Sequence, residues 1–357
     1  MILRSLTDWI ERRRSLREYR AFNTTSGDAY AGFFDDQIGI ARDSLDRGAH
    51  EKALQIWRLM HANYSYLTLT SEKAFRILIE VGHLNEAEIV VAEASKRFPR
   101  HRELYAALTA HIAYKAGDHP KALILCEQLR RRFPRSPNGY TIAADCHHDL
   151  GQTHEAENIL RLGVNKAPND LDLAARFARA ASARLDWTAG LERWTKLWNH
   201  LAPTIACLGQ AECLRQLGRF DEAETVLSDA CERFPMNPWP FAEHADLATL
   251  TGHHESAVAR WQILLNQFPG FDPAYPKAAA AMRTTGRDDD ADHLLQVGMT
   301  RSPGDLAINL ECARSADRRG DHGAAADRWA TVIARFPDCT EALAHVRLAN
   351  RNAGATS

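Results

Sequence analysis

The sequence predicts an all-α solenoid of helical hairpins, and three regularities support that fold class. A short turn recurs at intervals of 33 to 35 residues, a small residue follows every turn at the same distance, and a proline closes most of the units. A fixed period of this length is typical of repeat proteins, in which each unit buries its apolar face against the next. The 357 residues are therefore expected to form a stack of similar units rather than separate globular domains.

Glycine marks eight of the turns. The interval between Gly151 and Gly218 is twice the usual one, so a further unit is expected there, with its turn at Leu185-Asp186-Trp187. Including that unit, the chain is predicted to contain about nine copies. The turn glycines are Gly48, Gly82, Gly117, Gly151, Gly218, Gly252, Gly286 and Gly320.

Each period is predicted to run from a first helix through the turn to a second helix and then to a break. Proline cannot continue a helix, because it lacks an N–H group and clashes with the preceding turn. The first unit has Ser65 where the others have proline. Each second helix has about three turns and needs its neighbours for stability. The closing prolines are Pro99, Pro134, Pro168, Pro203, Pro235, Pro269, Pro303 and Pro337.

Small and large residues alternate at fixed places in the period. Alanine or glycine stands five residues after every turn, from Ala53 to Ala325, and the residue nine after the turn is apolar in every unit. A small side chain lets two helices approach closely, and a large one fills the space between units. These positions predict one core that continues along the stack.

This combination of period, turn glycine, small positions and closing proline resembles the tetratricopeptide repeat (TPR) family. The resemblance covers residues 34–339 and implies a right-handed α-solenoid with a concave groove, lined by the first helices, that binds peptides or proteins. The fifth unit departs from the pattern, since it lacks the turn glycine and has Gly190 in place of the second alanine. The Lys and Asn clamp of chaperone-binding members is absent, so that role is not expected.

The two ends lie outside the repeats. Residues 1–33 are predicted to form an amphipathic basic helix and a polar linker, and residues 340–357 a capping helix and tail. The helix over residues 2–20 carries six arginines against three acidic residues, so two roles stay open for it. It either docks on an anionic membrane surface or a partner, or it folds back to cover the first repeat.

Composition excludes several classes of protein. The net charge is −2, which disfavours a dedicated nucleic-acid binder, and 45% apolar with 25% charged residues is typical of ordinary folded proteins. No apolar stretch is long enough to span a bilayer. Seven cysteines without a Cys-x-x-Cys pair disfavour disulfides and Cys-type zinc sites. We expect a cytoplasmic protein without a secretory signal, a metal or a cofactor.

The histidines raise the question of catalysis. On a helix, adjacent residues point about 100° apart, so Cys146, His147 and His148 are not expected to converge on one ion. Asp145 and His148 share a helix face and could lie near His111 and Tyr114, as a polar ligand site or a weak metal site. No phosphate-binding loop, nucleophile elbow or HExxH motif is present. The chain is therefore expected not to be an enzyme.

The residues expected to line the groove are of both charges, which suits a peptide or a protein surface better than a polyanion. Four arginines at equivalent positions, Arg42, Arg76, Arg179 and Arg314, form a ladder that could bind carboxylates or phosphates. The full set of predicted partner contacts is Arg42, Arg76, His111, Tyr114, Asp145, His148, Arg179, Glu212, Arg215, Asp246, Arg283 and Arg314.

These observations favour a non-catalytic scaffold or adaptor that binds a protein or peptide in its concave groove. One alternative is an assembly factor that docks on a membrane surface through residues 2–20. Another is an accessory subunit of a glycosyltransferase or similar enzyme system, because some TPR relatives carry such fused domains. An enzyme built on Asp145, His148 and His111 is disfavoured, as is a helical-repeat RNA binder.

Overall fold

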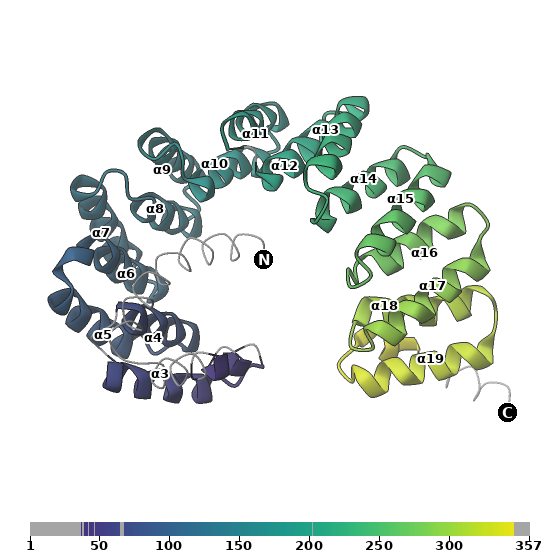
Figure 1. Cartoon of the computed structure of the whole chain (residues 1–357), viewed down its shortest axis with the longest axis horizontal. Coiled ribbons are helices and arrows are strands. Elements are labelled where there is room, and N and C mark those ends of the chain that lie inside the picture. The colour runs from purple at the N-terminus through teal and green to yellow at the C-terminus, as the bar shows by residue number, and fades with distance from the viewer. Residues whose placement is uncertain are drawn as a thin grey trace, which may run out of the picture. The chain divides into compact units, whose positions relative to one another are not determined.

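The computed structural model describes residues 37, 39–41, 43–45, 47–64, 68–201 and 203–345, and every regular element within them is a helix (Figure 1). The chain divides into two compact units, residues 1–180 and residues 181–357. The boundary falls within helix α10 (Leu171–Ala183), the first helix of the irregular fifth repeat.

The first unit contains helices that pair in sequence order. They are α3 (His50–Tyr64), α4 (Thr68–Val81), α5 (Leu84–Arg97), α6 (Arg102–Lys115), α7 (His119–Arg132), α8 (Asn138–Asp149), α9 (Thr153–Lys166) and most of α10, with a short 3-10 turn at Pro99–His101. The described residues before α3, from 37 to 45, are also helical. They are the expected first helix of the first repeat.

The second unit continues the same pattern. Its helices are α11 (Trp187–Leu201), α12 (Thr204–Gln216), α13 (Phe220–Arg233), α14 (Pro238–Leu250), α15 (His254–Gln267), α16 (Ala274–Thr284), α17 (Asp288–Arg301), α18 (Leu306–Arg318) and α19 (His322–Arg335). Residues 341–345 are helical as well. The all-α solenoid of helical hairpins predicted from the sequence is thus confirmed.

Each hairpin turns through one residue with left-handed backbone geometry. The eight turn glycines have φ between 69° and 85°, a region that suits glycine because it has no Cβ atom. At Gly218 the amide donates to the carbonyl of Arg215, and the next amide, that of Arg219, donates to Leu214 five residues back. These two bonds close the end of the first helix. The turn therefore sets the direction in which the second helix leaves.

The hidden fifth turn is where the spacing predicts it. Leu185 has φ 62° and makes the same pair of bonds as the glycines: its amide donates to Ser182, and that of Asp186 donates to Ala181. A β-carbon in this region approaches the following carbonyl too closely, at a cost of about 1–2 kcal/mol. The prediction of a turn at Leu185-Asp186-Trp187 is confirmed, with the strain that the loss of glycine brings.

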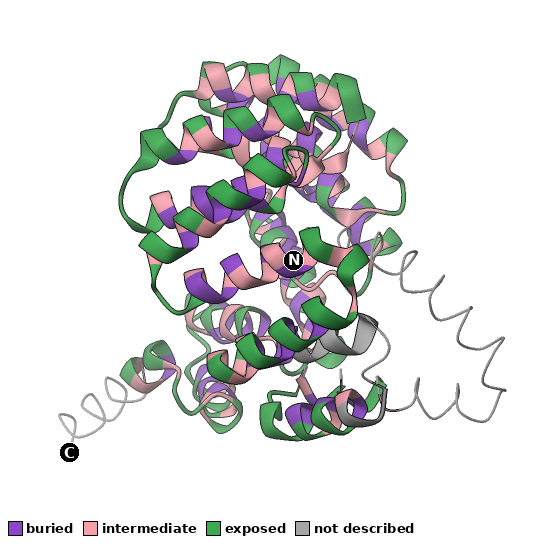
Figure 2. Cartoon of the chain, turned by 90° about the vertical axis from the view of Figure 1, so that its left-hand side faces the viewer, coloured by how far each residue is buried: buried purple, intermediate pink, exposed green. Residues whose placement is uncertain are grey.

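The core follows the small and large positions of the repeat. Ala53, Ala122, Ala223, Ala257 and Ala291 are fully buried at the small position of the second helices. The large position is filled by buried side chains such as those of Trp57, Trp194, Trp261, Leu295 and Trp329. Figure 2 shows the buried residues of the first unit on the sides of its helices that face neighbouring helices. Burial of these faces is the main stabilising contribution in such a stack.

Two tyrosines in first helices pack on glycines in second helices. A Cβ atom at Gly163 would lie 2.9 Å from the ring of Tyr140, and one at Gly298 would lie 2.8 Å from the ring of Tyr275. In both cases the tyrosine hydroxyl donates a 2.9 Å hydrogen bond to a closing proline carbonyl, that of Pro134 or Pro269. Among the described residues, each unit therefore contains one copy of this Tyr–Gly–Pro lock.

In each unit the even-numbered helices form one face and the odd-numbered helices the other. Successive even-numbered helices contact one another, as α6 does α8, α12 does α14 and α16 does α18. Figure 1 shows α6 and α8 on the inner side of the first unit and α7 and α9 on its outer side. Because neighbours approach more closely on the even-numbered side, that side is the concave one. The first helices of the repeats thus line the concave surface.

Replacing Leu185 by glycine should stabilise the protein. The substitution removes the Cβ strain at a left-handed residue, and little packing is lost because Leu185 is 70% exposed. We expect a gain of about 1 kcal/mol in the free energy of unfolding, measured by denaturant titration followed by circular dichroism. Leu185→Ala is the matched control, since it keeps the Cβ atom. Equal stability of the two variants would contradict the strain.

Replacing Gly209 by alanine should destabilise the protein. Gly209 lies in α12, and a Cβ atom there would overlap the indole ring of the buried Trp194. Overpacking of this kind costs about 1–3 kcal/mol, against a helix-propensity gain of about 1 kcal/mol. We expect a net loss of about 1 kcal/mol or more in the same titration. Gly304→Ala, where a Cβ atom meets nothing within 4 Å, should leave stability nearly unchanged.

Candidate functional site

Helix α14 presents a mixed stripe of side chains on the concave face of the second unit. Trp239, Glu243, Asp246 and Leu250 follow one another at intervals of four, three and four residues. At 100° per residue this spacing places them within an arc of about 60°. The stripe starts at the first helical turn, where the Asn237 side chain accepts a hydrogen bond from the amide of Trp239. An aromatic and an aliphatic side chain therefore flank two carboxylates.

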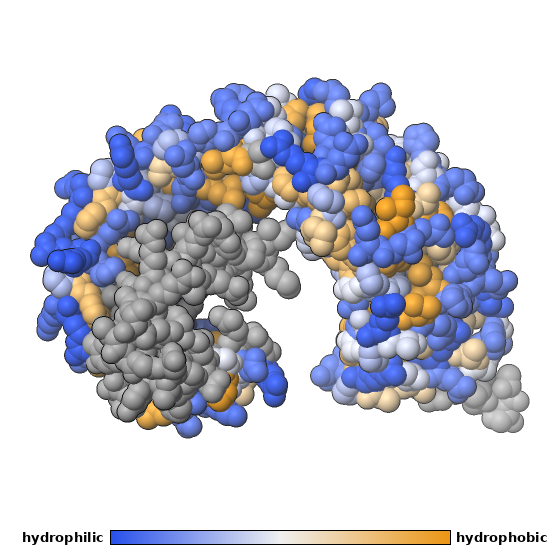
Figure 3. Space-filling model, in the orientation of Figure 1, coloured by the Kyte–Doolittle hydropathy of each residue, from blue (hydrophilic) through white to orange (hydrophobic). Residues whose placement is uncertain are grey.

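The apolar ends of this stripe are open to solvent. Leu250 is 54% exposed, and Trp239 is also exposed while its ring packs edge-on against Phe271 at a centroid distance of 5.1 Å. Figure 3 shows apolar side chains among hydrophilic ones over the region of α14 and α16. Exposed large apolar residues beside a hollow are typical of binding surfaces.

A cavity of about 490 Å³ adjoins the stripe. It is formed by α12, α13, α14 and α16, so three successive repeats contribute to it. Its floor is apolar and its rim carries charges of both signs. The lining residues are Ala211, Arg215, Ala223, Leu227, Glu243, Asp246, Leu247, Thr249, Leu250 and Lys277.

The charged groups at this cavity are paired with one exception. The Arg215 Nε atom donates to Glu212 at 2.9 Å on the same helix, and Lys277 on α16 forms an ion pair with Asp246 on α14. Glu243 forms no hydrogen bond and no ion pair with the part of the chain that the structure describes. Burial raises the pKa of Glu243 and repulsion by Asp246 adds to it, whereas Lys277 and Arg215 oppose the shift.

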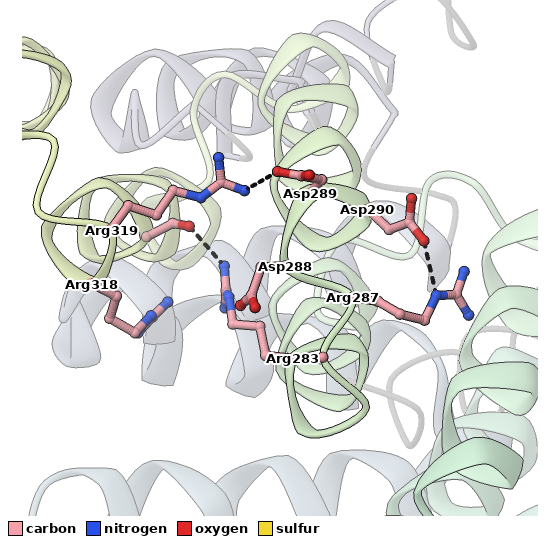
Figure 4. Close-up of a pocket in the computed structure, with 9 residues that line it drawn as sticks. Arg283, Arg287, Asp288, Asp289, Asp290, Arg318 and Arg319 are labelled. Atoms are coloured by element: carbon pink, nitrogen blue, oxygen red, sulfur yellow. Dashed lines mark hydrogen bonds and ion pairs between the residues drawn. The ribbon is translucent and has the colours of Figure 1, made fainter.

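A second cavity, of about 570 Å³, lies at the start of α17 and is lined by four arginines (Figure 4). Each of these guanidinium groups is bound to a carboxylate: Arg287 to Asp290 at 2.8 Å, Arg319 to Asp289 at 2.7 Å, and Arg283 and Arg318 to Glu311 at 2.8 Å and 2.5 Å. An incoming anion would have to displace these carboxylates. The cavity is therefore better understood as an internal ion-pair network.

Arg283 belongs to that network rather than to an open groove surface. Its side chain is only 14% exposed, and besides Glu311 it contacts the Ser315 hydroxyl at 3.1 Å and Asp292 at 3.5 Å. These contacts join α16 to α17 and α18. Arg283, which the sequence predicts as a partner contact, therefore links three helices. Its guanidinium donors are already bound inside the protein.

His111 and Tyr114 lie on α6 in the first unit, among aromatic rings. The His111 ring meets the edges of Phe75 and Tyr114, each at a centroid distance of 6.1 Å. Burial lowers the pKa of His111 to about 4, with further contributions from Lys115 and Arg76. Burial and a hydrogen bond with Asp149 raise the pKa of Tyr114 to about 12. Both side chains are therefore neutral at physiological pH.

Asp145 and His148 do not form the pair that their spacing suggests. Asp145 accepts a 2.7 Å bond from Arg176 on the next first helix, and Arg176 also donates to Asp172 at 2.8 Å. Within the described contacts His148 approaches Asp149, at 3.8 Å, and its side chain is 77% exposed. The structure leaves Asp145 in an arginine network and His148 outside it. No group of three metal-ligating residues occurs among the described residues.

The four arginines of the predicted ladder have different surroundings. Arg42 lies outside the described residues, and Arg76 is exposed on α4 and takes part in interactions there. Arg314 is bound to Glu341 at 2.7 Å and to Glu311 at 3.3 Å. Arg179 is exposed and forms no ion pair with the described residues, although partial burial lowers its pKa. Only Arg179 thus combines a groove position with an unused guanidinium within the described residues.

Burial makes several of the thiols poor nucleophiles. It raises the pKa of Cys126 to about 12 and those of Cys146, Cys207 and Cys312 to about 11. A thiol needs its thiolate form to attack or to bind a metal.

None of the described helices combines the length and the apolar character that a bilayer crossing requires.

Sequence reasoning proposed Glu212, Arg215 and Asp246, which lie at this cavity or beside it, but did not single out Glu243, Lys277, Trp239 and Leu250. On α14, Glu243 lies three residues before the predicted Asp246, Leu250 four residues after it and Trp239 seven residues before it, all on one helix face, whereas Lys277 lies on α16. Glu243 and Lys277 occupy equivalent places in successive repeats, 34 residues apart. Extending the predicted position of Asp246 by one helical turn in both directions would have found Glu243 and Leu250, and a second turn would have found Trp239. The repeat period then gives Lys277 from Glu243.

Residues 170–238 match a family model described as tetratricopeptide repeat. No curated protein sequence matches the chain. A tetratricopeptide repeat protein from Parabacteroides merdae is 15% identical, with a TM-score of 0.45 over 69% of this chain and 97% of that one. The C-terminal part of a TPR repeat-containing protein from Cytophaga hutchinsonii is 14% identical, with a TM-score of 0.48 over 66% of this chain and 98% of that one.

His111 should make the protein less stable in acid. Its pKa of about 4 lies below the value near 6.5 expected in the unfolded chain, so the unfolded state binds the proton first as the pH falls. We expect stability to be lost between pH 6.5 and pH 4, by about 2 kcal/mol relative to His111→Phe, in denaturant titrations at pH 7 and pH 4.5. Parallel losses in the two proteins would show that His111 titrates normally.

Proposed function

Because this chain is a tetratricopeptide repeat protein, we propose that it is a non-catalytic scaffold whose concave surface binds a segment of another protein. The single observation that carries this proposal is the 490 Å³ cavity beside the exposed stripe of α14. An apolar floor, a charged rim and solvent-exposed Trp239 and Leu250 form a surface that excludes water and also selects by charge.

The groove chemistry favours binding over catalysis. In the described part of the chain the buried thiols are protonated, His111 and Tyr114 are neutral, and Asp145 is held by Arg176. General acid–base or nucleophilic catalysis needs groups whose pKa values lie near the working pH and whose atoms can reach a substrate. Peptide binding needs only a shaped, mixed surface of the kind that the concave face provides.

Several of the predicted contacts remain candidates for this role. In the second unit they are Glu212, Arg215 and Asp246, all at the cavity or next to it. In the first unit Arg179 has an unused guanidinium, and Arg76, His111, Tyr114 and Asp145 lie on even-numbered helices, as Arg179 does. Docking on a membrane through residues 2–20, and an accessory role beside a glycosyltransferase, stay predictions. Residues 2–20 lie outside the described residues.

The proposal is tested by placing one negative charge on each face of the second unit. Leu250 on α14 and Ile263 on α15 are matched, since both are apolar and they are 54% and 52% exposed. Tagged full-length protein and the variants Leu250→Asp and Ile263→Asp are used to capture partners from the native cells, with quantitative mass spectrometry. We expect Leu250→Asp to lose its partner at least tenfold, because a charge on an apolar contact must be desolvated on binding.

The control decides which face is used. Ile263→Asp should retain the partner, and circular dichroism should show both variants folded. Retention by Leu250→Asp together with loss by Ile263→Asp would move the interface to the odd-numbered helices and contradict the proposal.

A further inference from the structure

The charges around the α14 cavity do not balance. Glu243 and Asp246 line the cavity together with Arg215 and Lys277, and a third carboxylate, that of Glu212, lies beside the cavity on α12. Glu212 and Asp246 are each bound to one of the cations. The Glu243 carboxylate is left over in a half-buried position with no partner in the described structure. Because both cations are bound to other carboxylates, the Glu243 carboxylate lacks a cationic partner at this cavity.

A half-buried carboxylate without a partner is unfavourable in the free protein. Removing it from water lowers its stability as an anion unless donors replace the lost hydrogen bonds. Neither nearby cation donates a hydrogen bond to Glu243. Lys277 is bound to Asp246 and lies over the ring of Trp261, and Arg215 is bound to Glu212. A ligand that brings its own cationic donor would gain a charge-assisted hydrogen bond at Glu243.

The positions of Trp239 and Leu250 predict which residues of a ligand would lie on either side of its cationic group. At 1.5 Å per residue along α14, Trp239 lies about 6 Å from Glu243, and Leu250 lies about 10 Å away on the other side. An extended segment advances about 3.3 Å per residue. A peptide lying along α14 would place apolar residues about two positions before and about three positions after its cationic residue.

We infer that the α14 cavity binds a lysine or arginine side chain of an extended peptide segment, with Glu243 as its acceptor and Trp239 and Leu250 contacting apolar residues on either side. This inference rests on the proposed function and specifies the chemistry of the partner. An acidic segment fits less well, because it would meet the Glu243 charge and would have to break the ion pairs of Arg215 and Lys277 to find donors.

The experiment begins without assuming a sequence. Full-length protein is used to select binders from a random library of 12-residue displayed peptides. The best binder is synthesised with a fluorescent label, together with the same peptide in which its basic residue is replaced by glutamine. Affinities for wild-type protein, Glu243→Gln and the control Glu255→Gln are measured by fluorescence anisotropy. Glu255 is an exposed residue in the first turn of α15, outside the cavity.

We expect the selected peptides to share one basic residue with apolar neighbours. Glu243→Gln should weaken binding of the basic peptide about tenfold, and the glutamine peptide should be weakened to a similar extent on wild-type protein. The two changes together should cost little more than one alone, because they remove the same contact. Glu255→Gln should bind as wild type does, and Glu243→Gln should remain folded, since Glu243 has no partner to lose.

Other results would overturn the inference. Binders without a basic residue, or binders whose affinity is unchanged by Glu243→Gln, would show that the groove binds peptides by other means, which leaves the proposed function intact. Additive effects of the two changes would place the basic residue elsewhere on the protein. An empty selection would also overturn it, and the scaffold proposal would then be judged by the capture experiment with Leu250→Asp alone.

Discussion

The structure depends on one backbone feature, the left-handed residue that ends the first helix of each repeat. With φ near +75° it lets two successive amides close the helix end and sends the chain back along the helix just formed. The small residues of both helices then meet at close range, and the large residue of the second helix reaches the next unit. A second helix of about 14 residues has little stability alone, so the turn determines whether its apolar face finds a neighbour.

The same geometry explains why the concave face is suited to binding. Successive even-numbered helices approach each other, so side chains from three repeats surround one cavity in the second unit. Residues one repeat apart, such as Glu243 and Lys277, become neighbours in space because the period is constant. A surface composed in this way can change one residue at a time without altering the backbone that presents it. The residues that stabilise the fold are therefore different from the residues on the concave surface that a ligand would contact.

Most of the fold could be predicted from the sequence, because the turn glycines, the closing prolines and the small positions repeat in register. Even the turn at Leu185 followed from the interval alone, since spacing survives the loss of the glycine. The binding surface was less predictable. Helical spacing predicts that Asp145 faces the groove, but only the structure shows that its carboxylate accepts a hydrogen bond from Arg176. In the same way the Arg283 guanidinium is bound to Glu311, Ser315 and Asp292. Periodicity gives the face of a helix, whereas the choice of partner depends on neighbours one repeat away.

The two copies of the Tyr–Gly–Pro lock have a consequence for how the chain tolerates damage. Tyr140 with Gly163 and Pro134 secures the first unit, and Tyr275 with Gly298 and Pro269 secures the second, with the same hydroxyl bond in each. In a stack where each repeat touches only its neighbours, the loss of one lock loosens the repeats beside it and does not reach the other copy. A substitution that removes the lock from one unit is therefore expected to destabilise that unit and to leave the other unit folded. The concave surface of the other unit then remains able to bind.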